Sequence, residues 1–291
     1  MAEIRDKNLY YVGGIVRDEI LGAPSFDTDY CYEGNAIEFA EKRNLNIIKK
    51  NPDFGTVRVL FDEKEIDIAS TRKETYPKAG HLPKVTDIGC CLEEDLKRRD
   101  FTINAIAKNT VTGEIIDCFG GLEDIKDKKI KILHDNSFKD DPTRIIRALK
   151  FSVRFGFELE EHTKKLQEDY LNNINFDMSM HRLKKELIET FNLNSADAFD
   201  KFKKQNIWRL LGKSAVHTKN SGAEIKKAVG SFSSENIWLI YLNFFGILES
   251  EIPFTRKERT ILEWAEKLKS QPATNNTPKE SIIINSLTEK Q

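Results

Sequence analysis

Two aspartates one residue apart, Asp27 and Asp29, stand in a stretch with the composition of a short β-strand near the amino terminus. Successive side chains of a strand point to opposite faces, so both carboxylates are expected on one face and close together. Such a pair is unfavourable unless cations lie between the two negative charges. We therefore expect Asp27 and Asp29 to be catalytic metal ligands, although an isolated Asp-x-Asp pair is also common on solvated strands.

Two glycines precede this pair in the chain. Gly13 and Gly14 follow an apolar run at residues 9–12 and open a helical run at 15–21 that stops near Gly22. Glycine lets the backbone approach a ligand closely, and the amino end of a helix favours anions. An anion site beside a metal site is typical of a nucleoside triphosphate bound with Mg²⁺. Alone, the two glycines indicate only a tight turn; the strand–Gly-Gly–helix–strand combination favours a site.

A third carboxylate is a candidate for the same site. Residues 54–61 and 64–68 have the alternation of two strands joined by a short turn, which predicts a hairpin. Glu65 and Asp67 share one face of the second strand. Asp67 is expected to act as a third catalytic acidic group if its strand lies beside that of Asp29, and a solvated strand face is the alternative.

Composition limits the class of protein. With 291 residues the chain is long enough for more than one hydrophobic core. Hydrophobic residues make up 39% and charged residues 32%, which is typical of a soluble globular protein. The formal net charge of −1 means that any nucleic-acid surface must be local. Four cysteines without metal-ligand spacing, and no apolar run of membrane-spanning length, indicate a cytoplasmic protein with reduced thiols and no membrane partner.

A pair of arginines further along the chain is a candidate for nucleotide contacts. Arg98, Arg99 and Asp100 directly precede an apolar run that contains Asn104. Because guanidinium groups match phosphate oxygens, this run is a candidate for contacts to a triphosphate and a ribose, and a charged surface is the alternative. The preceding segment, 70–92, is interrupted by prolines and glycine and lacks periodicity, which predicts a long loop.

Positive charge is concentrated between residues 126 and 154, where nine Lys or Arg outnumber four Asp. Asp141 and Pro142 form a strong helix-start signal, with Asp as the N-cap and Pro as the first helical residue. In the helix that follows, Arg144 and Arg147 fall on the face opposite the apolar residues. Phe151 joins this basic face, as a base-stacking or domain-packing surface would require, although a plain amphipathic helix explains most of the pattern.

Beyond residue 157 the chain reads as helices. Their tryptophans are expected to anchor a core, and their lysines are compatible with RNA backbone contacts. The expected helices lie at about 160–171, 179–192, 195–205, 221–229, 234–248 and 255–269, with Trp208, Trp238 and Trp264 among them.

Taken together, these stretches resemble the class II tRNA nucleotidyltransferase (CCA-adding enzyme) and bacterial poly(A) polymerase family, in the family's order over roughly residues 10–190. The most specific match is the run 98–105. The matching motifs are Gly13-Gly14-x-x-Arg17-Asp18 with Asp27-x-Asp29, Arg98 to Ala105, Asp117-x-x-Gly120-x-x-x-Asp124, and Asp140-Asp141-Pro142-Thr143-Arg144 continuing to Phe155-Gly156-Phe157.

The resemblance implies an α+β fold in which a polymerase-β-like head, with a small mixed sheet and helices, is followed by all-α neck and body domains. We expect the head over residues 1–138, the neck over 139–195 and the body over 196–270. The polar run from 271 to 291 is expected to be a flexible tail.

The resemblance also implies the chemistry. Asp27 and Asp29 would hold two Mg²⁺ ions while the 3′ hydroxyl of tRNA attacks the α-phosphate of CTP or ATP and pyrophosphate leaves. Asp141 and Arg144 would hydrogen-bond the edge of the incoming base, so that the protein selects the nucleotide. The full set of expected nucleotide-binding residues is Gly13, Gly14, Arg17, Arg99, Asp100, Asn104, Asp141, Arg144 and Arg147. The partners implied are the tRNA acceptor end and a nucleoside triphosphate.

Two departures from the family pattern leave the added bases open between CC, A and full CCA. Asp140 stands where the family commonly has Glu, and His181 replaces a Glu in the stretch that ends at Glu186. A poly(A) polymerase is the nearest alternative. A catalytically inactive RNA-binding protein is a remote one, because the acidic residues and Arg99 are all present. A metal-dependent phosphodiesterase is disfavoured because His134-Asp135 is isolated from other histidines.

Overall fold

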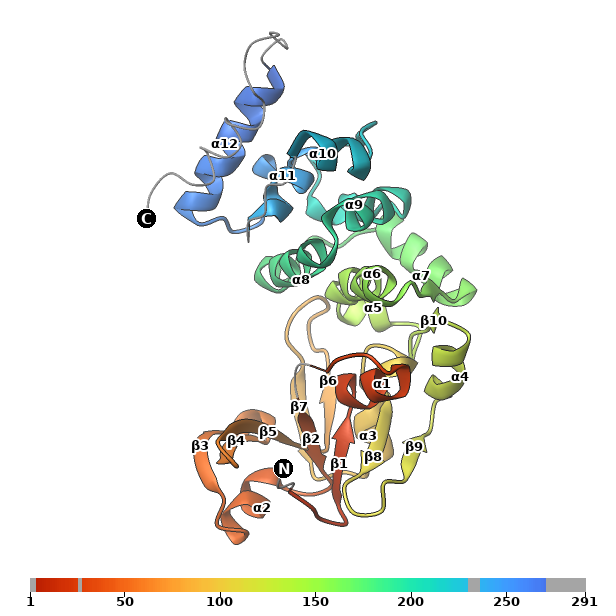
Figure 1. Ribbon diagram of the computed structural model, residues 1–291, viewed down its shortest axis with the longest axis vertical. Coiled ribbons are helices and arrows are strands. Elements are labelled where there is room, and N and C mark those ends of the chain that lie inside the picture. The colour runs from red at the N-terminus through yellow and green to blue at the C-terminus, as the bar shows by residue number, and fades with distance from the viewer. Residues whose placement is uncertain (1–3, 26–27, 230–235, 271–291) are drawn as a thin grey trace. The chain divides into compact units, whose positions relative to one another are not determined.

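The computed structural model describes residues 4–25, 28–229 and 236–270 (Figure 1). Asp27 and the expected tail at 271–291 therefore lie outside the described residues. The chain divides into two compact units, and each unit is formed by two separate segments of the chain. Unit 1 consists of Met1–Asp140 and Glu158–Thr163, and unit 2 of Asp141–Phe157 and Lys164–Gln291.

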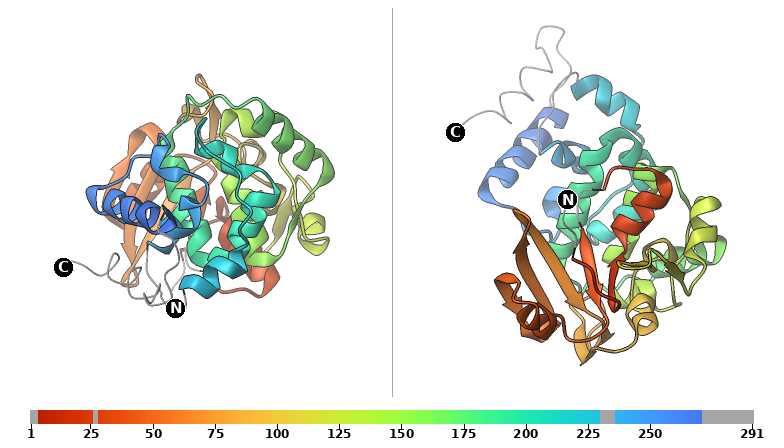
Figure 2. Two further views of the ribbon diagram at one scale, coloured as in Figure 1. Left: turned by 90° about the horizontal axis from the view of Figure 1, so that it is seen from above. Right: turned by 60° about the horizontal axis from the view of Figure 1, so that its bottom comes forward.

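Unit 1 is built on a seven-stranded sheet in the order β3-β4-β5-β2-β1-β8-β9. Only the β2–β5 pair is parallel and the other pairs are antiparallel, so the sheet is mixed as expected. The strands lie side by side in both figures of the whole chain (Figures 1 and 2). Their bounds are β1 (Leu9–Val12), β2 (Asp29–Tyr32), β3 (Asn46–Asn51), β4 (Thr56–Phe61), β5 (Lys64–Ser70), β8 (Ile106–Asn109) and β9 (Ile115–Asp117).

Short helices connect these strands. Helix α1 ends where Gly22 adopts the left-handed conformation, and Asn35 caps α2 by accepting hydrogen bonds from the backbone of Ile37 and Glu38. The helices of unit 1 are α1 (Gly14–Leu21), α2 (Ala36–Lys42), η1 (Pro52–Phe54), α3 (Leu92–Lys97), η2 (Thr102–Asn104), α4 (Gly121–Lys126) and α5 (Ser137–Asp140). One further pair of strands, β10 (Lys129–Ile130) and β11 (Glu158–Leu159), is parallel.

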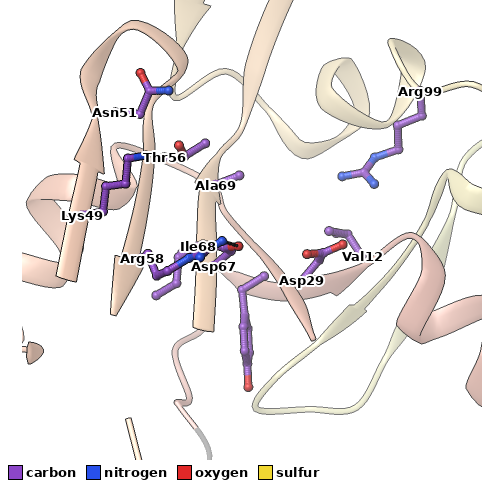
Figure 3. Close-up of a pocket in the computed structure, with 11 residues that line it drawn as sticks. Val12, Asp29, Lys49, Asn51, Thr56, Arg58, Asp67, Ile68, Ala69 and Arg99 are labelled. Carbon is purple, nitrogen blue, oxygen red and sulfur yellow. Dashed lines mark hydrogen bonds and ion pairs between the residues drawn. The ribbon is translucent and has the colours of Figure 1, made fainter. Parts of the chain in front are cut away.

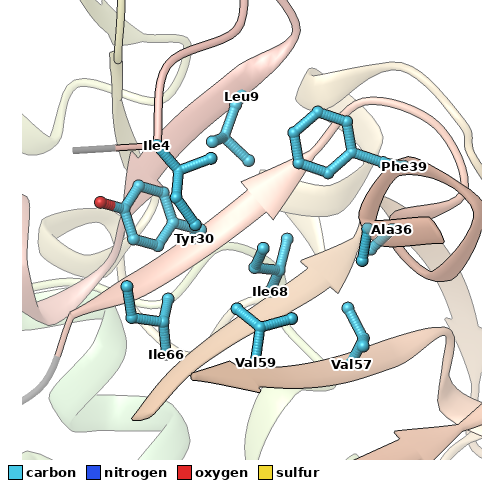
Figure 4. Close-up of a cluster of buried hydrophobic side chains, with 10 residues drawn as sticks. Ile4, Leu9, Tyr30, Ala36, Phe39, Val57, Val59, Ile66 and Ile68 are labelled. Carbon is cyan, nitrogen blue, oxygen red and sulfur yellow. The ribbon is translucent and has the colours of Figure 1, made fainter. Parts of the chain in front are cut away.

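The core of this unit explains why part of one face of the sheet is polar. Figure 4 shows Val57 and Val59 of β4, with Ile68 of β5 and Tyr30 of β2, packed beneath Phe39 of α2. Burial of these apolar side chains is the main favourable contribution to folding of the unit. Because strand side chains alternate, the residues between them must point to the opposite face. At β3, β4, β5 and the start of β2 that face carries the charged residues described below, while a second apolar cluster under α3 covers its part at β1 and β8.

Segment 70–92 is not the long loop that the sequence predicts. Strands β6 (Arg72–Thr75) and β7 (Lys84–Ile88) form a two-stranded antiparallel sheet within it, so this prediction was wrong. Residues of both strands are exposed or half-buried. Strands without a buried face carry no hydrophobic alternation, and alternation is the signal that sequence reading depends on.

Unit 2 is helical. Its aromatic core includes Phe191, Phe199, Phe202, Tyr241 and Phe245, whose rings contact one another. The helices are α6 (Thr143–Phe155), α7 (Glu161–Asn172, which begins in unit 1), α8 (Met180–Leu193), α9 (Ser195–Lys204), η3 (Ile207–Leu211), α10 (Gly222–Val229), α11 (Ile237–Asn243), η4 (Ile247–Glu249) and α12 (Arg256–Ser270). Across the described part of both units, every helix is too short or too polar to cross a membrane.

The tryptophan prediction holds for one residue. Trp238 is buried, Trp208 is half-buried, and the side chain of Trp264 lies outside the described part of the chain.

Helix α6 departs from the prediction in two ways. It begins at Thr143 rather than at Pro142, and Asp141 accepts a hydrogen bond from the backbone N–H of Thr143 at 3.1 Å. Arg144, expected on the basic face, is only 4% exposed. Phe151 is 5% exposed, which agrees with the packing surface that an aromatic residue on that face indicates. Helices α8 and α9 both pack against α6 and cover more of it than one apolar stripe. Helical periodicity alone cannot reveal a second packed face.

Candidate active site

Four charged residues form a row across the polar face of the sheet in unit 1. In register, Lys49 of β3 lies opposite Arg58 of β4, Arg58 lies opposite Asp67 of β5, and Asp67 lies opposite Asp29 of β2. We call these residues the charged row. The condition under which Asp67 was expected to join Asp29, that their strands are neighbours, is met by the β2–β5 pairing, and its catalytic role stays a prediction.

The charged row lines a cavity of about 410 Å³ (Figure 3). In that view Asp29 and Asp67 lie between Arg58 and Lys49 on one side and Arg99 on the other. The cavity is lined by Val12, Asp29, Tyr30, Lys49, Asn51, Thr56, Arg58, Asp67, Ile68, Ala69 and Arg99. Of the residues expected from the sequence to be functional, the structure thus brings Asp29, Asp67 and Arg99 together.

Asp67 is held by a two-point ion pair with Arg58. The Arg58 Nε donates to Oδ1 at 2.8 Å and Nη2 donates to Oδ2 at 2.7 Å. Both side chains are about half exposed, at 45% for Arg58 and 52% for Asp67. Exposed ion pairs contribute little to stability, about 0–1 kcal/mol, so this pair can exchange for another partner at small cost.

Arg99 is positioned by a buried carboxylate. Its Nη2 donates to Asp95 of α3 at 3.0 Å, and Asp95 also accepts from Arg98 at 2.8 and 3.0 Å. Burial by itself would raise the pKa of Asp95, but the guanidinium groups of Arg99 and Arg98 outweigh it, so the pKa is lowered. The Nε of Arg99 is buried and finds no hydrogen-bond partner among the described residues. A cation with an unused donor suits an anionic ligand.

Gly13 lies directly against Arg99 and has a backbone conformation that favours glycine. Its φ is +72°, and an added Cβ would lie 3.0 Å from Arg99 Nη1. The strand–Gly-Gly–helix unit therefore places the backbone at the start of α1 directly against a guanidinium group. The amino end of α1 and the Arg99 guanidinium make this end of the cavity suitable for phosphate, while the Gly13 N–H itself donates to the backbone oxygen of Ile106 at 3.3 Å.

Arg17, Asp100 and Asn104 are placed differently. Arg17 is 3% exposed, donates to Asp18 at 2.7 and 2.9 Å, and also donates to Asn104. Asn104 in turn donates to Asp100 at 2.9 Å. This buried network joins α1 to the segment after α3 and does not line the cavity. Direct contact of these three side chains with a nucleotide stays a prediction.

In unit 2, Asp141 is the centre of a second polar cluster. Its Oδ1 accepts from Thr143 Oγ1 at 2.6 Å, and its Oδ2 accepts from Arg182 of α8. The Tyr170 hydroxyl is buried without a hydrogen-bond partner among the described residues, and burial, together with the charge of Asp141, raises its pKa. Arg147 pairs with Glu186 at 3.3 Å.

Sequence reasoning missed three of these residues. Lys49 and Arg58 carry no motif, and only the strand register brings them beside Asp67. Arg182 stands in the motif stretch noted above, but its pairing with Asp141 joins positions 41 residues apart. Alternation on β4, where Arg58 stands between two buried valines, was the available signal for Arg58, whereas β3 has no such alternation to indicate Lys49.

The donor set of the cavity fits a hard divalent cation. Carboxylate oxygens are the ligands that Mg²⁺ prefers, and Asp29 and Asp67 provide them at adjacent register positions. Among the described residues, no group of three or more His, Cys, Asp or Glu is arranged to hold a metal. Asp27, the partner expected for Asp29, is outside that set.

Comparison with known proteins gives the class. Residues 9–131 match the family model of the poly A polymerase head domain. An A-adding tRNA nucleotidyltransferase of Aquifex aeolicus is 46% identical over 56% of this chain, which spans only 20% of that relative's length. An A-adding tRNA nucleotidyltransferase of Halalkalibacterium halodurans is 32% identical over 93% of this chain and 67% of its own length. The chain belongs to the class II tRNA nucleotidyltransferase family.

Solved structures agree with this assignment. A CCA-adding enzyme in an apo form has a TM-score of 0.75 at 27% identity, with coverage of 96% of this chain and 78% of that one. A tRNA nucleotidyltransferase complexed with a primer tRNA and an incoming ATP analogue has a TM-score of 0.68 at 28% identity, with coverage of 91% and 84%. The polymerase-β-like character expected for the head is therefore confirmed.

Proposed function

We propose that this protein adds nucleotides from ATP, CTP or both to the 3′ end of tRNA and releases pyrophosphate. The observation that carries the proposal is the cavity in which Asp29 and Asp67 lie beside Arg99. Family membership supports it, and the A-adding relatives favour addition of the terminal A. The reaction is proposed to take place in the cytoplasm.

The positions of the cavity residues and of their neighbours support the following roles. Arg99 and the backbone at Gly13 bind the triphosphate. Asp29, with Asp27, would hold Mg²⁺, which on binding neutralises charge on the phosphate and on the attacking and leaving oxygens. Asp67 accepts a hydrogen bond from the attacking 3′ hydroxyl, and Arg17, Asp100 and Asn104 keep the loop that carries Arg99 in place.

We further propose the family's division of labour. The head at 1–138 carries catalysis, and the helical neck at 139–195 and body at 196–270 contact the RNA acceptor end. Asp141 and Arg144 select the base, since a carboxylate accepts from an exocyclic amine while a guanidinium donates to ring acceptors.

One incubation tests the proposal and separates its rivals. The purified protein is given tRNA ending before, within and after the CCA sequence, with each triphosphate separately, and chain length and pyrophosphate are measured. One to three additions that then stop support a tRNA enzyme, with a single A on tRNA ending in CC as the expected product. Unlimited A addition indicates a poly(A) polymerase. Binding of tRNA without pyrophosphate release indicates an inactive RNA-binding protein.

A further inference from the structure

The charged row contains an unexplained feature, because like charges stand side by side. Lys49 and Arg58 are directly opposite each other on β3 and β4, and Asp67 and Asp29 are directly opposite on β5 and β2. Like charges at opposed positions destabilise a sheet. The carboxylate half is accounted for by the proposed roles of Asp29 as a metal ligand and of Asp67 as the acceptor of the 3′ hydroxyl. The cationic half, Lys49 with Arg58, has no role in the proposed function.

The cationic half is available to a ligand. Lys49 Nζ makes no hydrogen bond or ion pair within the described ranges, and Arg58 pairs only with the exposed carboxylates of Asp67 and Glu65. The next register pair, Asn51 with Thr56, lies on the same face and also lines the cavity. Two cations with two neutral polar side chains beside them suit a phosphate group.

The positions of Lys49 and Arg58 relative to Asp29 and Arg99 indicate which phosphate group they bind. Neighbouring strands lie about 4.8 Å apart. Across the row the Cα atom of Arg58 is therefore about 10 Å, and that of Lys49 about 14 Å, from the Cα atom of Asp29. Arg99 and Gly13, the proposed triphosphate end, lie on the other side of Asp29 from both cations (Figure 3). In an in-line displacement the attacking and leaving oxygens are on opposite sides of the phosphorus. The attacking RNA must therefore enter from the side of Lys49 and Arg58.

We propose that Lys49 and Arg58 bind the last phosphodiester of the acceptor RNA, the one 5′ to its terminal nucleoside. This inference rests on the proposed function. Arg58 exchanges its ion pair with Asp67 for the phosphodiester, which frees the Asp67 carboxylate for the incoming 3′ hydroxyl. Arrival of the RNA is thereby coupled to release of Asp67.

The first test separates the RNA from the triphosphate. Arg58→Ala and Lys49→Ala are each expected to raise the KM for tRNA at least about tenfold, the lower end for a lost hydrogen bond to a charged group, with the KM for ATP unchanged. Arg43→Ala is the matched control, because Arg43 is 46% exposed and pairs with Asp6 in the same unit but outside the cavity. It should leave both constants unchanged. A raised KM for ATP instead would place the triphosphate at these cations and overturn the proposal.

The second test addresses the single phosphodiester. An acceptor RNA with a neutral methylphosphonate at its last linkage should lose at least about tenfold in apparent affinity on the wild type. On the Arg58→Ala protein the methylphosphonate RNA and the unmodified RNA should have nearly the same apparent affinity, since the variant and the neutral linkage remove the same interaction. Equal losses on both proteins would overturn the proposal. Thermal unfolding of each variant checks that the fold is retained, as expected for an exposed ion pair.

These outcomes are distinct from failure of the proposed function. If the wild type adds no nucleotide to any tRNA, the proposed function fails. If it adds nucleotides and Arg58→Ala keeps the wild-type KM for tRNA, only the present inference fails.

Discussion

Asp29 and Asp67 occupy opposed positions on two parallel strands, and their apolar sequence neighbours, Tyr30 beside Asp29 and residues 66 and 68 around Asp67, are turned into the core. This alternation fixes the direction of both carboxylates, because a slip of one residue would turn them into the apolar interior. The site therefore depends on the same pattern that forms the core.

Replacement of Asp29 by Asn tests its proposed role directly. The amide keeps the shape of the side chain but removes the negative charge that a metal ligand needs. We expect nucleotide addition to slow by at least about 10²-fold, with an unchanged melting temperature. Asp62→Asn, in the exposed turn between β4 and β5, should keep wild-type activity. Normal turnover of the Asp29 variant would remove this residue from the mechanism.

Asp95 gives a prediction about pH. Its pKa is lowered in the folded state, so it contributes stability that is present above its unfolded value, about 3.9, and is lost as the pH falls. The free energy of unfolding should therefore fall on acidification below about pH 4 less steeply for Asp95→Asn than for the wild type.

At pH 7 the same variant should be about 3 kcal/mol less stable, because two arginines lose their buried partner. Glu93→Gln, an exposed position of the same helix, is the control. Denaturant unfolding followed across the pH range measures both effects, and parallel curves for wild type and Asp95→Asn would contradict the assignment.

The elements of the head differ in how readily they follow from sequence. Strands β4 and β5 and helix α1 are predictable because each has one buried face and a glycine or turn at its end. Strands β6 and β7 are not, because neither has a buried face to give a period. The cationic half of the charged row was also missed, since register between strands is set by the assembled sheet and not by local pattern.

Among the elements, α4 is fixed by one close approach. Gly121 begins this helix, and an added Cβ would lie 2.3 Å from the backbone oxygen of Thr102 in η2. Gly121→Ala should destabilise the protein by about 1–3 kcal/mol, since backbone must move. Gly14→Ala, at the same position of α1, meets nothing closer than 3.6 Å and should change stability by less than about 1 kcal/mol. Thermal or denaturant unfolding of both variants compares them, and equal effects would show that the contact with η2 is unimportant.

At the scale of the whole molecule, each unit has its own apolar core, and among the described residues no group of three or more His, Cys, Asp or Glu is arranged to hold a structural metal. We expect chelation of divalent metal to abolish pyrophosphate release while the melting temperature stays within about 2 °C, and added Mg²⁺ to restore release. Release that continues in excess chelator would rule out the proposed metal chemistry. A large fall in melting temperature would show a structural metal instead.

The residues proposed to select the base belong to unit 2, where sequence alone was least informative. The signal at Asp141 and Pro142 located the start of α6 to within one residue. It could not reveal that Arg144 would be buried or that Arg182 would bind Asp141, because both depend on packing of helices distant in sequence.

The return of the chain to unit 1 at Glu158–Thr163 has a practical consequence for handling the protein. Strand β11 pairs with β10, and Thr163 Oγ1 accepts from the backbone of Ile132 at 3.2 Å, so unit 1 is completed by residues that follow α6. A protease cut between residues 140 and 141 would leave two fragments that still share a sheet. Such a nicked protein should migrate as one species under native conditions and separate only in denaturant.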